Sequence, residues 1–447
     1  GKDASMPFGA VRLALKYGSA LLPSFYTRVK GPYIKTIITP PFEIKRSGDP
    51  QRDIHDNLQD VVRLFEKYIR RYPKEYLWTY KAWKYSKEAG ILILSDGKTG
   101  HLRQAQAAAK MLSSCLAERQ IRADIETAPV KFRNRFTKSL LGVSGCLAGK
   151  YSCQGCLACL RKALVGENYD YLIRKKPDYI ISCGSALAPV NFLLSRENLA
   201  KSICVMRPGL LSAGKFNLVL MPRHDCPPRR GNIVVTDGAL NLIDGDYLEK
   251  EAQRLSQSCK VIPRLRSGQA KSQVYLGFLI GGDTKKFCLN VDIVREAARQ
   301  VKLAAEKLNA HILVTTSRRT SKETEAMVKR ELQDCPRCKL LVIANEKNIP
   351  EAVGGILGLS SIVVTSPESI SMISEAVAAK KHVLVFREKG LDKKHARFLE
   401  LFSRKKYITL AEGPCLERAI EDIFRSEPRI PALADNFAVR EALKRLI

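Results

Sequence analysis

The 447-residue sequence has no run of 18 or more apolar residues, so we expect no segment to span a bilayer. We expect no secretory signal peptide, and with 13 cysteines this favours a reducing compartment in which thiols stay free or bind metal. Zinc-finger spacings and aromatic-rich RNA-binding motifs are missing, so we expect no nucleic-acid partner. The chain begins at Gly1 rather than Met, which we interpret as a fragment or a processed start.

Acidic residues are scarce relative to basic ones, with 45 Asp and Glu against 75 Lys and Arg and a formal charge of +30. This excess favours an anionic partner such as phospholipid, lipopolysaccharide phosphate or nucleotide, although a basic, well-solvated surface explains part of it. Hydrophobic residues make up 45% of the chain, which is ordinary for globular proteins and argues against disorder. The length allows two or three domains, each with its own core.

Residues 1–88 differ in pattern from the rest and form the first predicted domain. A strand-like run at Tyr33–Thr39 precedes a helical pattern at Ile54–Tyr72 that carries its apolar residues on one face. Tryptophan and tyrosine then alternate with lysine up to Lys84, a composition that suits a membrane interface. An aromatic mini-core with a basic rim explains the same residues equally well.

After Gly90, short apolar runs alternate with amphipathic stretches. Such runs, separated by helical patterns, indicate buried parallel strands in βαβ units. The predicted strands are Ile91–Leu94, Tyr179–Cys183, Ile203–Met206, Leu218–Met221, Ile233–Val235, Val274–Ile280, Ile312–Val314, Leu340–Ile343, Ile362–Val364 and Val383–Phe386. The clearest predicted helices are Arg103–Arg119, Val291–Leu308 and Ile370–Ala379.

A basic stretch at Gln257–Ser272 containing proline and glycine separates the strands into two series and is typical of an interdomain linker. We therefore predict two doubly wound, Rossmann-like α/β domains at residues 90–260 and 272–447. Ligands of such domains bind at the carboxyl ends of the strands, so a cleft between the two is the expected site.

The first strand leads into Ser95–His101, a glycine turn that opens a helix. Gly97, Lys98 and Gly100 would let backbone amides approach an anionic group on the acceptor side. Asp96 and His101 are candidates for a general base, although a tight turn with an Asp cap has the same pattern. His224 and Asp225 follow a later strand and are further acceptor-side candidates, with a helix cap as the alternative.

In the second domain, polar residues follow three predicted strands. Ser317 and Arg318 could hold a diphosphate, or could be solvated loop residues. A serine-rich segment that opens a helix could hold phosphate and place an acid against a ribose diol, or could be a capping box. The candidate donor-binding residues are Gly281, Gly282, Ser317, Arg318, Ser369, Ser371 and Glu375.

Four cysteines, Cys146, Cys153, Cys156 and Cys159, have spacings that suit a structural zinc ion or an iron–sulfur cluster. Free, buried cysteines are the alternative. The predicted chemistry requires no cofactor.

The motifs of the two α/β domains resemble those of the mitochondrial-fission "elongated mitochondria" family and its bacterial relatives, which are assigned as glycosyltransferases of GT-B fold. The resemblance covers Gly90 to the C-terminus and rests on Ser-Asp-Gly-Lys-x-Gly-His, His-Asp, Gly-Gly, Thr-Ser-Arg-Arg-Thr and Ser-x-Ser-Met-Ile-Ser-Glu-Ala, in that order. It implies that Glu375 binds the donor ribose and that Gly281, Gly282 and Ser369 face the diphosphate. One departure is Pro367-Glu368, where the family pattern has Asp.

Residues 1–88 resemble the C-terminal part of lipid A biosynthesis lauroyl/myristoyl acyltransferases, through Leu-Leu-Pro-x-Phe, Pro-Pro and Tyr-Pro-x-x-Tyr-Leu-Trp. Those enzymes use a His-x4-Asp-type motif. We assign no such pair to His55, which is followed by Asp56 and Asp60, and we expect this segment to be inactive as an acyltransferase.

The sequence therefore predicts a GT-B glycosyltransferase that moves a sugar from a nucleotide-sugar donor to a lipid-linked or lipopolysaccharide-core acceptor. An anionic glycolipid acceptor implies a cytoplasmic protein that is peripherally associated with the inner membrane. The alternatives are a non-catalytic adaptor of the mitochondrial-fission type, and lipid A acyltransferase activity if the missing upstream half is present.

Overall fold

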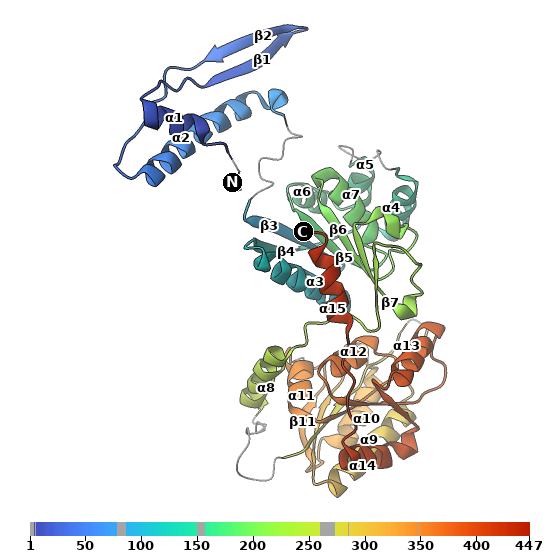
Figure 1. Ribbon diagram of the computed structural model, residues 1–447. Helices are drawn as coiled ribbons and strands as arrows, with labels where there is room; N and C mark the ends of the chain where they lie inside the picture. The colour runs from blue at the N-terminus through green and yellow to red at the C-terminus, as the bar shows by residue number, and fades with distance from the viewer. Residues whose placement is uncertain are drawn as a thin grey trace. The chain divides into compact units, whose positions relative to one another are not determined.

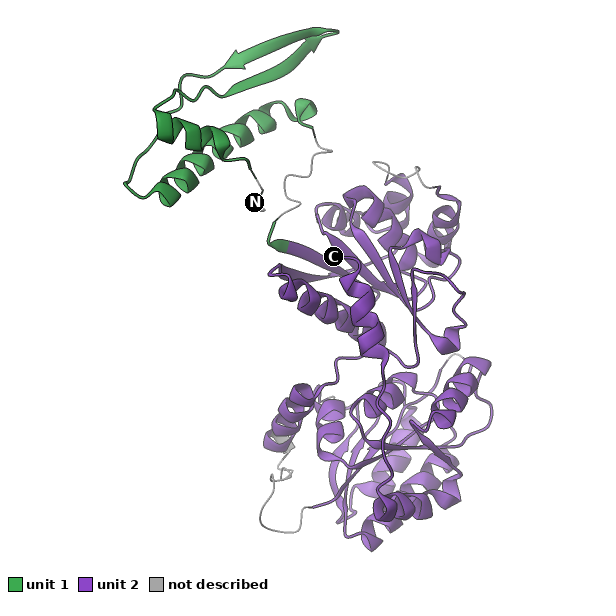
Figure 2. Cartoon of the chain, in the orientation of Figure 1, with its two compact units in different colours: residues 1–88 green, residues 89–447 purple. Residues whose placement is uncertain are grey.

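The computed structural model describes residues 4, 6–77, 86–149, 157–259, 273–284, 286–347 and 349–447. They form two compact units, residues 1–88 and 89–447 (Figure 2). Within the described residues, no helix combines the length and the apolar character needed to cross a membrane.

The described residues of the first unit form a two-stranded antiparallel hairpin, two α-helices and a 3-10 turn. Its elements are α1 (Gly9–Tyr17), β1 (Ser24–Lys30), β2 (Tyr33–Ile38), α2 (Pro50–Arg71) and a 3-10 turn at Pro73–Glu75. The ring of Phe25 in β1 stacks on Tyr68 of α2 at 3.8 Å between centroids and meets Phe65 edge-on at 5.2 Å. An aromatic mini-core is therefore present, whereas Trp78 and Trp83 lie outside the described residues.

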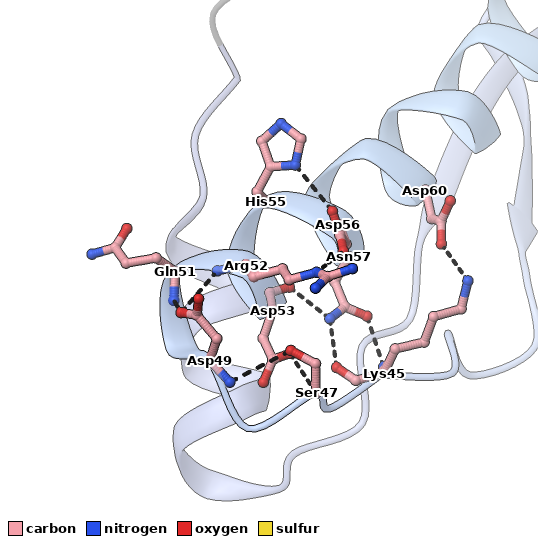
Figure 3. A network of polar contacts seen from close by, with 10 residues as sticks. All are labelled: Lys45, Ser47, Asp49, Gln51, Arg52, Asp53, His55, Asp56, Asn57 and Asp60. Atoms are coloured by element: carbon pink, nitrogen blue, oxygen red, sulfur yellow. Dashed lines mark hydrogen bonds and ion pairs between the residues drawn. The ribbon is translucent and has the colours of Figure 1, made fainter.

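Polar contacts fix the start of α2 (Figure 3). Asn57 is fully buried, and its side-chain oxygen accepts a 2.8 Å hydrogen bond from the backbone N–H of Lys45. Its amide nitrogen donates to the carbonyls of Lys45 and Asp53 at 2.8 and 2.7 Å. Asp49 caps the helix by accepting from the N–H groups of the first turn, and Pro50 occupies the first helical position. These contacts hold the preceding loop against the helix.

The second unit contains two six-stranded sheets (Figure 1). The first has the order β4-β3-β5-β6-β7-β8, with the pairs from β3 to β8 parallel. Its strands are β3 (Glu88–Ser95), β4 (Arg122–Pro129), β5 (Tyr179–Cys183), β6 (Lys201–Val205), β7 (Leu218–Pro222) and β8 (Ile233–Thr236). The helices that precede or connect them are α3 (Thr99–Glu118), α4 (Arg135–Leu147), α5 (Ala158–Ala163), α6 (Gly166–Ile173) and α7 (Ala188–Asn198).

The second sheet is parallel throughout, with the order β11-β10-β9-β12-β13-β14. Its strands are β9 (Tyr275–Leu279), β10 (His311–Thr315), β11 (Cys338–Val342), β12 (Ile362–Thr365), β13 (His382–Phe386) and β14 (Thr409–Ala411). The associated helices are α8 (Gly245–Cys259), α9 (Val291–Lys307), α10 (Lys322–Leu332), α11 (Ala352–Leu359), α12 (Ile370–Ala378), α13 (Lys393–Arg404), α14 (Leu416–Ser426) and α15 (Asp435–Lys444).

All ten strands and all three helices that the sequence predicts after Gly90 are present within a few residues of their expected limits. The strands β4 and β14, which the sequence did not predict, each lie at an edge of a sheet. β4 is mostly exposed and carries arginine, aspartate and glutamate, so it has no continuous apolar run. The prediction of two Rossmann-like α/β domains is confirmed.

Two helices do not pack on the domain that their position in the sequence predicts. α8 lies within the range 90–260 but packs on α11 of the second domain. α15 lies within the range 272–447 but packs on α3 of the first domain, where Val439 and Leu443 are fully buried (Figure 1). The chain therefore passes between the domains twice, once between β8 and α8 and once between α14 and α15. The predicted linker at Gln257–Ser272 instead begins within α8 and leads to β9 of the same domain.

Candidate functional site

A cavity of about 610 Å³ lies between the two domains of the second unit. The first domain contributes the start of α3 and the loops after β7 and β8. The second contributes the loops after β10 and β12 and the starts of α12 and α13. All of these segments follow the carboxyl ends of parallel strands, which is where open α/β sheets bind ligands.

Asp96 and His101 form a hydrogen-bonded pair at the beginning of α3. His101 Nδ1 lies 3.0 Å from Asp96 Oδ2, and Lys98 Nζ lies 3.0 Å from the same oxygen. Although burial opposes it, the hydrogen bonds from His101 and Lys98 hold the pKa of Asp96 well below its ordinary value. An ionised Asp96 fixes Nδ1 of His101 as the protonated nitrogen, which leaves Nε2 free to accept a proton. His101 lines the cavity, and Asp96 orients it from behind.

The residues of the turn before α3 have two different roles. Gly97 adopts the left-handed φ of 80°, which permits the tight turn after the strand. Lys98 and Gly100 line the cavity, whereas Gly97 does not. A Cβ atom on Gly100 would lie 3.8 Å from Ser371 Oγ of the second domain, so the starts of α3 and α12 approach each other here.

Glu375 lies one turn into α12 with 9% of its surface exposed, and it lines the cavity with Ser369 and Ser371. Burial raises the pKa of Glu375, and the guanidinium of Arg103, 3.6 Å from its carboxylate, opposes that rise. Because Arg103 belongs to α3, this ion pair joins the two domains. The N-terminus of α12 has no side-chain cap, so its first N–H groups can receive an anion.

Positive charge predominates around the cavity. Ser317, Arg318 and Arg319 line it from the loop after β10. In total the lining contains five Lys or Arg residues and two Glu residues: Lys98, Arg103, Arg318, Arg319, Lys394, Glu368 and Glu375. The site is suited to a ligand with more than one negative charge.

Gly281 and Gly282 do not line the cavity, and the expected contact of these glycines with a diphosphate is not met by this geometry. Their N–H groups donate to Ser366 Oγ at 2.8 Å and to Glu368 Oε1 at 2.7 Å. A Cβ atom at Gly281 would lie 1.7 Å from Glu368, and one at Gly282 would lie 2.2 Å from the backbone of Arg319. The glycines allow three loops to meet and thereby position Glu368, whose pKa burial raises.

His224 is 4% exposed and lines the cavity, while its neighbour Asp225 forms a 2.9 Å ion pair with Lys394 of α13. The ring of His224 meets Phe398 edge-on at 5.4 Å between centroids. Burial, reinforced by the charge of Lys394, lowers the pKa of His224 to about 4, so this imidazole is neutral at physiological pH. Its Nδ1 atom has no hydrogen-bond partner among the described residues.

The predicted cysteine cluster falls largely outside the described part of the chain, because Cys153 and Cys156 lie there. Cys146 is half-buried near the end of α4, and Cys159 is exposed on α5. No group of three potential metal ligands occurs among the described residues.

Four basic residues that line the cavity were not predicted from the sequence: Arg103, Arg319, Lys394 and His395. Lys394 and His395 open α13 after β13, with Asp392 as the helix cap. Both residues could have been predicted as the other loop residues were, because they belong to a polar segment that follows a predicted strand. Arg103 gave no such signal, because its site role depends on Glu375 in the other domain.

In the first unit, His55 and Asp60 have the four-residue separation of the acyltransferase motif, which the sequence analysis discounted (Figure 3). The spacing therefore does not exclude the pair, but the geometry does. His55 is largely exposed and lies 3.1 Å from Asp56, whereas Asp60 pairs with Lys45 at 2.8 Å and with Arg63. His55 and Asp60 therefore form contacts with different partners and do not pair with each other.

Solved structures share this two-domain arrangement. One from Listeria monocytogenes, assigned as a UDP-N-acetylglucosamine 2-epimerase, is 10% identical, with a TM-score of 0.50 over 80% of this chain and 95% of that one. The UDP-GlcNAc 2-epimerase of Methanocaldococcus jannaschii is 12% identical, with a TM-score of 0.48 over 80% and 98%. MurG of Acinetobacter baumannii is 11% identical, with a TM-score of 0.39 over 80% and 98%. At these identities the likeness concerns the fold alone.

The two parallel sheets, with a cavity at the facing ends of their strands, define a protein of GT-B architecture. The family model of mitochondrial fission ELM1 matches residues 99–436, so the chain belongs to the mitochondrial fission ELM1 family. A second model, bacterial lipid A biosynthesis acyltransferase, matches residues 1–85. No curated protein matches the chain in sequence.

Proposed function

We propose that the second unit is a glycosyltransferase that binds a nucleotide-sugar donor in the cavity and transfers the sugar to an acceptor hydroxyl. The observation that carries this proposal is the placement of the Asp96–His101 pair and of Glu375 on opposite domains around one cavity. A general base on one domain and a nucleotide-binding helix start on the other are the two parts that the reaction needs.

The donor would bind mainly to the second domain. Glu375 would accept hydrogen bonds from the ribose diol, in exchange for its ion pair with Arg103. The free N–H groups of α12, with Ser371 and Arg318, would hold the diphosphate. The positive lining supports an anionic donor.

In the reaction, Nε2 of His101 would take the proton of the acceptor hydroxyl, whose oxygen forms a bond to the anomeric carbon. The bond from that carbon to the diphosphate oxygen breaks, and the nucleoside diphosphate leaves with the electron pair. Arg318 and the helix amides would stabilise the charge that develops on the leaving group. Direct in-line displacement of this kind inverts the anomeric centre.

We further propose a lipid-linked or lipopolysaccharide-core acceptor and a cytoplasmic location at the surface of the inner membrane. Support comes from the acyltransferase-like segment in the same chain and from the net charge of +30. Both favour an anionic glycolipid over a neutral sugar.

Thermal unfolding of the full chain with a panel of nucleotides and nucleotide sugars tests the donor site. We expect one nucleotide class to raise the Tm, and Glu375→Gln to reduce the shift strongly, because the neutral amide offers the ribose diol one acceptor oxygen in place of two charged ones. Glu323→Gln, on the exposed start of α10, is the control that should keep the shift. If well-folded protein shows no shift with any nucleotide, the proposal fails and a non-catalytic adaptor is favoured.

The Asp96→Asn variant tests the base. Asparagine keeps the shape of the side chain but loses the charge that orients His101, so we expect kcat to fall by about 10²- to 10⁴-fold. The nucleotide-induced rise in Tm should persist, because Asp96 does not line the cavity. Nucleoside diphosphate release measures the rate, with the exposed Asp124→Asn as the control. An unchanged kcat would remove His101 as the base.

A further inference from the structure

The helix α4 carries an exposed apolar stripe on the surface of the first domain of the second unit. Phe136, Leu140, Val143 and Leu147 are 75%, 55%, 46% and 81% exposed. Their spacings of four, three and four residues place them on one face of the helix. Four large apolar side chains aligned on one helix face differ from the single exposed apolar residues that surfaces ordinarily contain.

The rest of α4 is well anchored, so the stripe is not the exposed side of a loosely held segment. Leu141 and Gly145 are buried on the opposite face, and the helix packs on α5 and α7. Asn134 and Thr137 form a capping box at its beginning. At its end, Lys215 Nζ donates to the carbonyls of Gly145 and Cys146 at 2.8 and 2.9 Å. The helix therefore presents its stripe from a fixed position.

The segment of chain that contains the stripe has charge of one sign. Residues 127–166 contain no Asp or Glu and seven Lys or Arg: Lys131, Arg133, Arg135, Lys138, Lys150, Arg161 and Lys162. All of these except Lys150, which lies outside the described residues, are exposed. An apolar stripe in a segment whose charged residues are all cations matches a surface that offers both hydrocarbon and anionic groups.

We propose that α4 is a docking helix for an anionic lipid bilayer, with its apolar stripe in the acyl-chain boundary and the neighbouring cations on the lipid phosphates. Helices that lie in the membrane interface combine these two features. Lys and Arg residues near an anionic membrane strengthen binding because the negative surface potential attracts them. A second copy of the chain is a poorer occupant, because a symmetric contact would bring two acid-free basic surfaces together.

This surface is separate from the proposed reaction, since none of the stripe residues lines the cavity. The docking test and the nucleotide test can therefore fail independently. Docking through α4 would hold the first domain, which carries His101, at the membrane surface.

Binding of the full chain to phosphatidylethanolamine–phosphatidylglycerol vesicles, measured by co-sedimentation, tests the proposal. We expect the double variant Phe136→Ser with Leu140→Ser to bind at least about tenfold more weakly, because two large apolar side chains no longer enter the lipid. The matched control is Phe437→Ser on α15, a phenylalanine of nearly equal exposure at 73%, which should bind as the native chain does. Pure phosphatidylcholine vesicles should bind the native chain weakly.

Three outcomes would overturn the proposal. The native chain could fail to bind the anionic vesicles, or the double variant could bind them as tightly as the native chain. Alternatively, sedimentation without vesicles could show that the native chain self-associates and the double variant does not, which would make the stripe a contact between copies. If the double variant does not fold, Val143→Ser with Leu147→Ser on the same stripe decides the question by the same measurement.

Discussion

Gly184 illustrates how a single residue can set the position of the proposed base. It follows β5 with a φ of 84°, and a Cβ atom there would lie 2.9 Å from Cε1 of His101. The imidazole therefore occupies the space that a side chain at position 184 would need. The sequence gives no hint of this contact, because the two residues are far apart along the chain.

We predict that Gly184→Ala displaces His101 and destabilises the fold by about 1–3 kcal/mol, because alanine is strained at this φ. Chemical denaturation measures the stability, and nucleoside diphosphate release measures the loss of activity. Gly231→Ala is the matched control, since a Cβ atom there meets no atom within 4 Å. Equal behaviour of the two variants would contradict the assigned role of Gly184.

The lowered pKa of His224 predicts that the stability of the fold depends on pH. Burial lowers its pKa to about 4 from 6.5, so the unfolded chain binds more protons than the folded one between these values. The free energy of unfolding should therefore fall as the pH falls from about 6.5 to about 4, by on the order of 3 kcal/mol. His224→Gln should flatten this part of the profile, whereas the exposed His55→Gln should not. Parallel profiles for native protein and His224→Gln would show that His224 is not the group responsible.

At the scale of the element, α4 depends on a contact from a distant loop. Lys215 Nζ reaches three carbonyls at the end of the helix, including that of Ala148 at 2.5 Å. Helix ends leave such carbonyls without partners, and a cation there also interacts favourably with the helix dipole.

We predict that Lys215→Met destabilises α4 by about 1–2 kcal/mol, because the carbonyls lose a charged donor. Hydrogen exchange should accelerate in residues 141–148 and remain unchanged in the distant α10. Lys201→Met, an exposed lysine of β6 in the same domain, should leave the exchange of α4 unaltered. Unchanged protection in Lys215→Met would show that the helix end is satisfied in another way.

At the scale of the whole second unit, α15 connects the end of the chain to the first domain. Arg440 and Lys444 pair with Glu118 of α3, and Arg119 donates to the carbonyl of Lys444 at 3.1 Å. Leu443 is fully buried against the first sheet. The final helix therefore stabilises the domain that carries Asp96 and His101.

We predict that Leu443→Ala destabilises the first domain by about 2–5 kcal/mol through the loss of buried contacts and the cavity left behind. Calorimetry should show that this domain unfolds at a lower temperature, and hydrogen exchange should accelerate in α3. Phe437→Ala, on the exposed side of the same helix, should change neither measurement. Acceleration confined to the second domain would contradict this packing.

Much of the architecture can be predicted from local pattern. The central strands are covered on both faces, so each needs a continuous apolar run, and all ten of these runs were recognisable. The loops with candidate site residues could be predicted because the carboxyl ends of parallel strands bind ligands. His101, His224 and Glu375 were found in this way, and all three line the cavity.

Contacts between distant segments were decided only by the tertiary structure. The edge strand β4 has no apolar run, α8 and α15 pack on the opposite domains, and Arg103 meets Glu375 only across the cavity. The backbone N–H groups of Gly281 and Gly282 go to Ser366 and Glu368 rather than to a ligand, which no glycine pattern could reveal. Periodicity and turn residues record how each segment buries its own side chains, whereas these features depend on which segments the folded chain brings together.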